Sequence, residues 1–182
     1  MKIKVLWLAM ALLVLGGCSS DDSYSKFSRF KASFTYYYVQ TMAPLRDALY
    51  SPGAFCTIKL TMDRKLLFTS LTLQQSDNVT DPAQYQRYVC LSGFIVGYAN
   101  SLEMGNDELD RVCFDLACSN CYHDNSIKRD LALREGGYAY CQRCKRTYNL
   151  NNLGIISAGE KGRPLERYHI SLPDQNRMVL YN

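Results

Sequence analysis

Four of the eight cysteines form two closely spaced pairs, Cys118-Ser-Asn-Cys121 and Cys141-Gln-Arg-Cys144. Residues 122–140 separate the two pairs. A C-x-x-C turn directs two sulfurs toward one ion, and two such turns from adjacent hairpins complete the tetrahedron of a closed zinc site, with Zn–S bonds of about 2.3 Å. The spacing agrees with that of four-cysteine zinc sites. The sequence therefore predicts one metal ion bound by four thiolates.

The elements that must position these loops are mostly β-strands. Alternating or continuous apolar runs bounded by turn residues indicate the strands, and those at 111–117 and 138–140 lead into the two cysteine loops. Residues 42–50 form a short amphipathic stretch, whereas the polar segment 74–84 is expected to be an exposed loop. The expected strands are 30–39, 55–60, 66–73, 88–98, 111–117, 138–140, 167–172 and 178–181.

The N-terminus predicts an exported, lipid-anchored protein. Lys2 and Lys4 precede an apolar run over residues 5–15, which is shorter than the roughly 20 residues needed to span a bilayer and is typical of a signal peptide. The run ends in Leu-Gly-Gly before Cys18, which resembles a bacterial lipobox. The resemblance implies a signal peptide over residues 1–17, acylation of Cys18 and membrane attachment through that lipid.

Residues 18–26 then form a polar tether. The serines and acids that follow Cys18 resemble the sorting pattern of outer-membrane lipoproteins from Bacteroides-like bacteria. This resemblance implies a protein on the outer membrane, facing the periplasm or the cell surface.

The charge balance excludes a basic footprint for nucleic acid. Two of the 21 basic residues lie in the signal peptide, which leaves 19 against 17 acidic residues. Cleavage after residue 17 of 182 leaves 165 residues, which suits one domain over residues 27–182. The metal-binding loops occupy about residues 113–150 of that domain.

From residue 111 onward the sequence resembles the Rieske domain family. Cys121-Tyr-His123 matches the family's C-x-H loop, and Cys141-Gln-Arg-Cys144 matches its later C-x-x-H loop; in the family these loops hold a [2Fe-2S] cluster. The resemblance implies a Rieske-like antiparallel β-sandwich or barrel with a metal-binding subdomain like rubredoxin or a zinc ribbon. The family's closing pattern is matched by Thr147-Tyr148-Asn149-Leu150, Gly154, Gly159, Gly162, Pro164-Leu165 and Tyr168-His169-Ile170.

Two observations favour Zn²⁺ over [2Fe-2S]. Cys144 stands where the family has its second-loop histidine, so these loops cannot build the two-histidine iron of a Rieske centre. The leader also lacks the arginine pair of the export route for folded proteins, so a cluster would need assembly outside the cytoplasm, whereas zinc binds during folding. An electron-transfer protein with [2Fe-2S] is the alternative.

A third alternative contains no metal. In an oxidising compartment each C-x-x-C pair could close as a disulfide ring. A thioredoxin-type redox role is disfavoured, because neither pair is expected to open a helix after a strand in a thioredoxin-like βαβ order. Of the remaining cysteines, Cys56 and Cys90 could form a disulfide, or they and Cys113 could be buried thiols.

His123 is the alternative ligand, in which case it would replace Cys118 in a three-cysteine, one-histidine site. Otherwise it lies near the metal or faces solvent, which leaves both cysteine pairs matched. No nucleophile triad, carboxylate pair or phosphate-binding glycine loop reaches motif strength. We therefore expect a non-catalytic cell-envelope module whose metal fixes a loop surface for a protein partner that the sequence does not identify.

Overall fold

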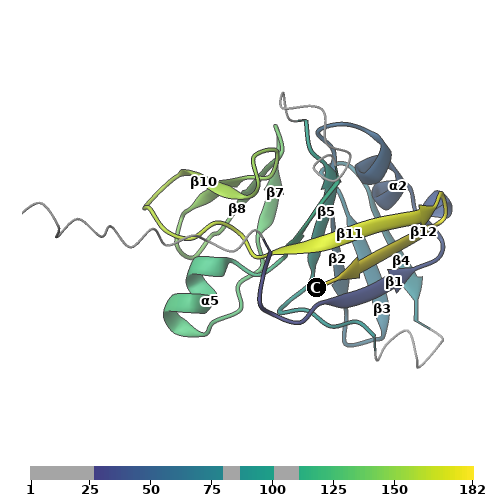
Figure 1. Ribbon diagram of the computed structural model, residues 1–182, viewed down its shortest axis with the longest axis horizontal. Coiled ribbons are helices and arrows are strands. Elements are labelled where there is room, and N and C mark those ends of the chain that lie inside the picture. The colour runs from purple at the N-terminus through teal and green to yellow at the C-terminus, as the bar shows by residue number, and fades with distance from the viewer. Residues whose placement is uncertain (1–26, 80–86, 101–110) are drawn as a thin grey trace, which may run out of the picture.

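The computed structural model describes residues 27–79, 87–100 and 111–182. The predicted signal peptide, Cys18 and the polar tether lie outside these residues. Within the described ranges, no helix has both the length and the apolar character needed to cross a bilayer. The chain forms two antiparallel sheets that lie at opposite ends of the molecule (Figure 1).

The larger sheet has eight strands, and each neighbouring pair is antiparallel. The sheet curls so that its two edge strands come into contact. The Tyr36 hydroxyl on one edge strand donates to Asp77 Oδ2 on the opposite edge strand at 3.0 Å. In spatial order the strands are β1 (Ser33–Tyr36), β12 (Arg177–Tyr181), β11 (Arg167–Asp174), β6 (Arg111–Asp115), β5 (Phe94–Tyr98), β2 (Phe55–Leu60), β3 (Lys65–Thr69) and β4 (Gln74–Asn78).

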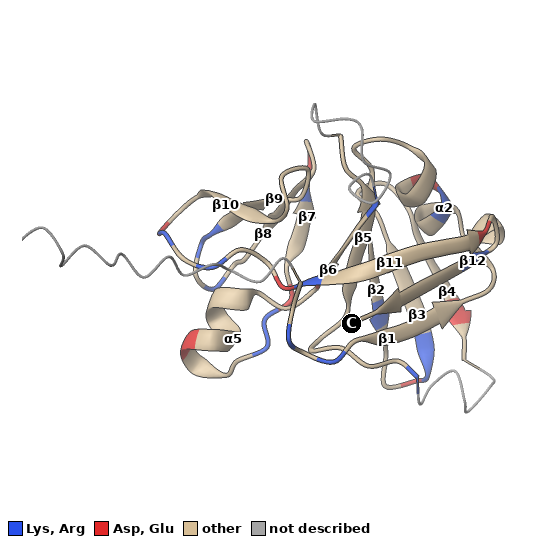
Figure 2. Ribbon diagram, in the orientation of Figure 1, with Lys and Arg blue, Asp and Glu red and all other residues tan. Residues whose placement is uncertain are grey.

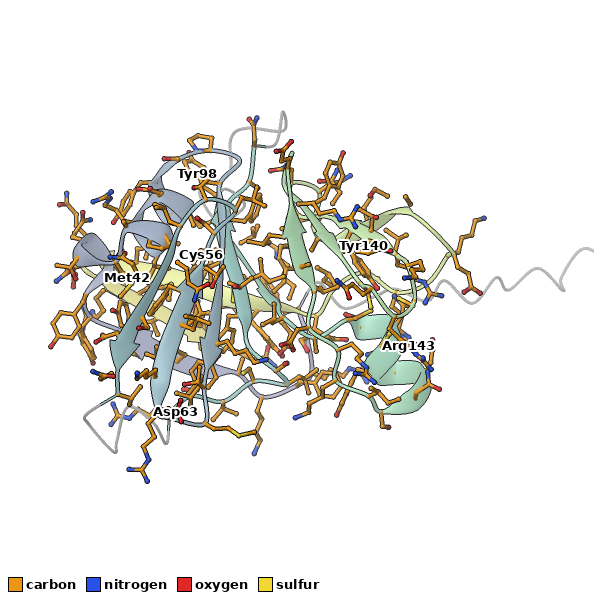
Figure 3. All side chains as sticks on the ribbon, turned by 180° about the vertical axis from the view of Figure 1, so that it is seen from behind. Met42, Cys56, Asp63, Tyr98, Tyr140 and Arg143 are labelled. Atoms are coloured by element: carbon orange, nitrogen blue, oxygen red, sulfur yellow. The ribbon has the colours of Figure 1, made fainter. Side chains whose placement is uncertain are left out.

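The inside of this curl holds the larger core. Its members come from all the strands except β4 and from the helix α2 (Ala43–Tyr50), which follows the 3₁₀ turn η1 (Val39–Thr41). Pro44 suits the first turn of α2, and Leu45 and Leu49 are fully buried against the sheet. Figure 3 labels Met42 and Cys56 in this part of the molecule.

Strands β5 and β6 are buried on both faces, which explains their continuous apolar sequences. Side chains alternate between the faces of a strand. Phe94 and Val96 therefore belong to the inner core, whereas Ile95 and the β6 residue Phe114 belong to a second core on the outer face. This second core joins the larger sheet to the cysteine-bearing subdomain.

The smaller sheet has four strands in the order β10-β9-β8-β7 and lies beside the short helix α5 (Ser119–Asn125). Gly136 and Gly137 turn the chain between β7 and β8, the two strands of this sheet that come first in the sequence. Their φ angles are 76° and 75°, in a region that residues with side chains disfavour. The strands are β7 (Ala132–Arg134), β8 (Tyr138–Tyr140), β9 (Thr147–Asn149) and β10 (Ile155–Ala158).

The mainly β prediction is confirmed, with several local corrections. Residues 74–78 form the edge strand β4 and not an exposed loop, because their backbone pairs with β3 although their side chains are polar and mostly exposed. The predicted strand 88–98 is shortened to 94–98, with only an isolated bridge from Val89 to Ser33 before it.

The first predicted strand, 30–39, is also shortened, to 33–36. Phe34 and Tyr36 are buried on its inner face as expected, but Tyr38 lies beyond the strand and is 56% exposed. The predicted strand 66–73 ends at Thr69. In both cases the apolar pattern continues past the last backbone pairing.

Candidate metal centre

The first cysteine pair lies where strand β6 gives way to helix α5. Cys118 is the N-cap residue of α5, and its carbonyl accepts the Tyr122 N–H at 3.0 Å. The Cys118 N–H in turn donates to the Arg129 carbonyl at 2.8 Å, which fixes the junction. The first pair therefore opens a helix after a strand, but α5 is not part of a thioredoxin-like βαβ unit, because β6 and the next strand, β7, belong to different sheets.

The second pair lies in the turn between β8 and β9. The Cys141 N–H donates to the Arg146 carbonyl at 3.0 Å, and the Lys145 N–H donates to the Cys141 carbonyl at 2.9 Å. Lys145 adopts a left-handed φ of 61°, which lets the chain reverse directly after Cys144. The site thus combines one tight turn with one helix start, and not the two similar turns that the sequence predicts.

The structure brings the four predicted sulfurs together. Their Sγ atoms all lie within 4.8 Å of one another. Two separations cross between the loops: 3.6 Å from Cys118 to Cys144, and 3.7 Å from Cys121 to Cys141. These separations are far longer than the about 2.05 Å of a disulfide. They match the edge of about 3.8 Å that a tetrahedron with 2.3 Å Zn–S bonds has.

The cluster is mostly shielded from water. Cys118 and Cys141 are fully buried, Cys121 is nearly so, and Cys144 is half-buried. Three cysteines of the cluster belong to the outer core with Phe114 and Leu116, so the site joins the two sheets. Figure 3 labels Tyr140 and Arg143 in this part of the molecule.

Tyr148, in the middle of β9, directs a proton donor at one sulfur. Its hydroxyl lies 3.1 Å from Cys118 Sγ and accepts from Asn120 Nδ2 at 2.9 Å. The Asn120 amide cannot be reversed, because its Oδ1 accepts the Arg163 N–H while its Nδ2 donates to the Arg163 carbonyl, each at 2.9 Å. The Tyr148 proton is therefore available to Cys118.

Gly162 makes room for this arrangement. A Cβ atom at Gly162 would lie 2.2 Å from Asn120 Oδ1. Because three hydrogen bonds hold the Asn120 amide, it cannot move aside without losing its contacts with Tyr148 and Arg163.

The environment affects the individual thiols differently. Burial raises the pKa of Cys118 to about 11, although the Tyr148 hydroxyl opposes this, and burial also raises the pKa of Cys121. For Cys144, burial would raise the pKa, but hydrogen bonds from the backbone and side chain of Arg146, together with those from Cys118 and Cys141, outweigh burial and lower the pKa to about 7. These four thiols could hold a metal ion, whose positive charge would compensate the negative charge of deprotonated sulfurs.

Arg146 also joins the second loop to the chain that follows β10. Its Nε donates to the Glu160 carbonyl at 2.9 Å, and its Nη2 donates to Glu160 Oε2 at 3.0 Å and to the Lys161 carbonyl at 3.2 Å. The side chain is buried, so these contacts stabilise the surroundings of Cys144. Figure 2 shows the other basic residues scattered over both sheets.

The two histidines lie away from the sulfur cluster. His123, on α5, has its Nε2 2.8 Å from Glu166 Oε1. His169, on β11, stacks between the rings of Phe27 and Tyr181. The group of donors that could hold a metal ion consists of the four cysteines alone among the described residues.

The other described cysteines are free thiols, so the suggested disulfide between Cys56 and Cys90 is absent. Cys56 and Cys113 flank Val96 on neighbouring strands and are buried in the inner core. Burial raises the pKa of Cys56 and of Cys90 to about 12. The disulfide rings proposed for the two C-x-x-C pairs are also absent.

Sequence reasoning missed the roles of three residues around the cluster. Tyr148 stood out only as part of the pattern that resembles the end of the Rieske family. Alternation along β9 nevertheless places its side chain on the same buried face of the small sheet as Ala139 of β8. Asn120 lies between the cysteines of the first pair, where spacing arguments specify nothing. Arg146 follows the second pair, and no local signal shows that its side chain is buried.

No protein-family model matches the chain, and no curated protein matches it. The geometry of the four cysteines therefore carries the functional argument.

Proposed function

We propose that the four cysteines bind one Zn²⁺ ion in a closed structural site, and that the protein is a non-catalytic, lipid-anchored module of the cell envelope with Rieske-like architecture. The observation that carries the proposal is the sulfur geometry. Four Sγ atoms lie within 4.8 Å of one another, and two inter-loop separations of 3.6 and 3.7 Å match a tetrahedron around a single ion.

The donor set supports zinc in a structural role. Four thiolates are one of the usual ligand sets of structural zinc sites, whereas catalytic zinc keeps one position for water or substrate. All four positions would be filled here by sulfur from the protein. Zinc would stabilise the folded subdomain directly, since its small sheet and short helix have little apolar core of their own.

The [2Fe-2S] alternative fits the distances less well. A two-iron cluster binds its thiolates on two different metal atoms, so sulfurs on different irons must lie farther apart than four ligands of one ion. The Tyr148 contact to Cys118 Sγ would suit either occupant, because hydrogen bonds to sulfur orient metal ligands and also adjust cluster potentials.

The curled sheet and the separate cysteine-bearing sheet support Rieske-like architecture, and the lipid anchor rests on the sequence around Cys18. The envelope location follows from that anchor. An exposed loop surface beside the metal would be the part available to a protein partner.

Elemental analysis of the native protein tests the metal assignment. We expect about one zinc per chain and a colourless sample. Cys121→Ser should lose the zinc, while Cys90→Ser, outside the cluster, should retain it. Two irons with labile sulfide and absorption above about 400 nm would instead establish the cluster. A metal-free protein with four reactive thiols would contradict both.

Metabolic labelling with a radioactive fatty acid tests the anchor. The wild-type protein should incorporate label and Cys18→Ser should not. Cys90→Ser serves as the matched control and should incorporate label like the wild type. Label retained by Cys18→Ser would refute the lipobox assignment.

A further inference from the structure

A half-open groove lies between β10 and the segment that connects it to β11. Its volume is about 570 Å³, within the range of about 300–1,000 Å³ that small-molecule sites occupy. Apolar side chains make up most of its wall, and Ile155 and Leu153 at its rim are each 44% exposed. Its apolar lining includes Ile156, Pro164 and Leu165, and its basic members are Lys161 and Arg167.

Arg167 is the unusual member of this lining. It is only 5% exposed, yet its Nε and Nη1 atoms are buried without a hydrogen-bond partner. Buried polar groups are almost always hydrogen-bonded, and a guanidinium retains its charge in proteins. A buried cation with unsatisfied donors beside an apolar groove indicates that something with acceptor oxygens completes it.

The strand places this side chain on the groove side of the sheet. The neighbouring Tyr168 points into the inner core, where its hydroxyl donates to Asp115 Oδ2 at 3.0 Å. Because successive side chains alternate, Arg167 points to the outer face. The ring of Phe27 lies there, with its centroid 5.0 Å from the guanidinium carbon.

Within the described ranges, no nearby acid is paired with Arg167. The adjacent carboxylate, Glu166, is engaged elsewhere: one oxygen accepts from Ser28 Oγ and the other lies 2.8 Å from His123 Nε2. Among the described residues, no ion pair is formed by Arg167. Within this described part of the chain, the inner end of the groove therefore has a positive charge that no carboxylate compensates.

We propose that this groove binds a small amphipathic carboxylate, with its aliphatic body along the apolar wall and its carboxylate at Arg167. A single buried cation matches a single negative charge, and a guanidinium suits the planar oxygens of a carboxylate. Lys161 adds a second positive charge to the lining. The proposal does not depend on what the four cysteines bind.

Calorimetric titration of the purified protein with sodium octanoate tests the proposal. We expect one saturable site, with octan-1-ol, which has the same tail without charge, binding at least about tenfold more weakly. Arg167→Met should weaken octanoate binding at least about tenfold and leave octan-1-ol binding unchanged. Arg177→Met, an arginine change on the same C-terminal hairpin, is the matched control and should bind octanoate like the wild type.

A second variant decides the matter if Arg167→Met does not fold. Ile155 is an exposed rim residue, so Ile155→Asp should fold and should repel octanoate, whereas Leu73→Asp, at a similarly exposed site outside the lining, should not. Octanoate binding that is absent, or insensitive to both groove variants, would overturn the site. Tighter binding of octyl phosphate than of octanoate would overturn the assignment to a carboxylate.

Discussion

Tyr148 is the side chain that contacts one sulfur of the candidate metal site most directly. Its hydroxyl accepts from Asn120 and lies 3.1 Å from Cys118 Sγ, so it can donate to that sulfur when Cys118 is a thiolate, which orients the sulfur and favours its deprotonated form. Outer contacts of this kind typically change metal affinity by about 10–100-fold when removed. The contact lies in a buried site, where an unsatisfied donor is also costly.

We therefore expect Tyr148→Phe to weaken zinc binding by about tenfold or more. The variant should also lower the free energy of unfolding by about 1–3 kcal/mol, because Asn120 Nδ2 loses an acceptor. Competition titration with a chromophoric chelator measures the affinity. Tyr140→Phe is the control, since that ring packs under the Arg134 guanidinium and lies on the same small sheet. Equal affinities for the two variants would show that the Tyr148 hydroxyl does not act on the metal ligand.

Zinc binding should release protons near neutral pH. Without metal, the raised pKa values of Cys118 and Cys121 keep both thiols protonated, whereas the pKa of about 7 leaves Cys144 partly ionised. Metal binding requires thiolates, so protons compete with zinc and the apparent affinity should fall as the pH is lowered. Titrations at pH 7.5 in two buffers of different ionisation enthalpy should show release of at least about two protons per zinc. Binding without proton release would contradict these protonation states.

In the metal-free protein, Cys144 and Cys118 change the stability of the fold with pH in opposite directions. The lowered pKa of Cys144 contributes stability above its unfolded value of about 8.5, and that contribution is lost as the pH falls through about 7. The raised pKa of Cys118 contributes stability at lower pH, which is lost as the pH rises through about 11. Zinc would override both effects by fixing the thiolates.

Among the elements, the strands with strong apolar patterns were the predictable ones. The predicted bounds 55–60 and 138–140 agree with β2 and β8, and the predicted C-terminal hairpin agrees with β11 and β12 to within two residues at each end. In these segments, burial of alternate or successive apolar side chains determines where the backbone pairs.

The elements that sequence reasoning missed are polar. Strand β4 reads Gln-Gln-Ser-Asp-Asn and pairs only through its backbone at a sheet edge, so no hydrophobic period marks it. Helix α5 reads Ser-Asn-Cys-Tyr-His-Asp-Asn and also lacks an apolar stripe. Its place depends on tertiary contacts at Cys118 and Asn120, which a local pattern does not contain. The cysteine pairs were predictable because their spacing is itself the chemical signal.

Asp115, at the end of β6, ties three segments together. Its oxygens accept from the backbone N–H groups of Leu91 and Ala117 at 2.8 and 2.7 Å and from the Tyr168 hydroxyl at 3.0 Å. Asp115→Asn would turn one acceptor into a donor that faces a backbone N–H. We expect a loss of about 1–3 kcal/mol in the free energy of unfolding by urea.

The matched control for this change is Asp174→Asn, at the exposed turn of the β11–β12 hairpin. Its ion pair with Arg177 is at the surface, where such pairs contribute about 1 kcal/mol or less. A similar loss for both variants would show that the buried network at Asp115 is not the source of the effect.

In the whole molecule, the two faces of the large sheet belong to two cores, and only the outer core includes cysteines of the cluster. The inner core fills the curl of eight strands and includes α2, whereas the outer core includes cysteines of the cluster. The large sheet can therefore bury apolar side chains without the metal. The small sheet, whose strands have three or four residues, depends on the cluster and on the outer faces of β5 and β6.

Removing the metal should therefore unfold one end of the molecule and not the other. Structural zinc contributes an apparent binding energy of about 10–16 kcal/mol in small zinc domains, far more than a four-stranded sheet of this size could replace. After treatment with a strong chelator, backbone amides of β8 and β9 should lose protection from hydrogen exchange, while those of β2 and β3 should keep it. Restoring zinc should restore the protection, and Cys121→Ser should resemble the chelated wild type. Loss of protection in both sheets together would show that the two cores fold as one unit, because the outer face of β5 and β6 then could not remain ordered without its cover.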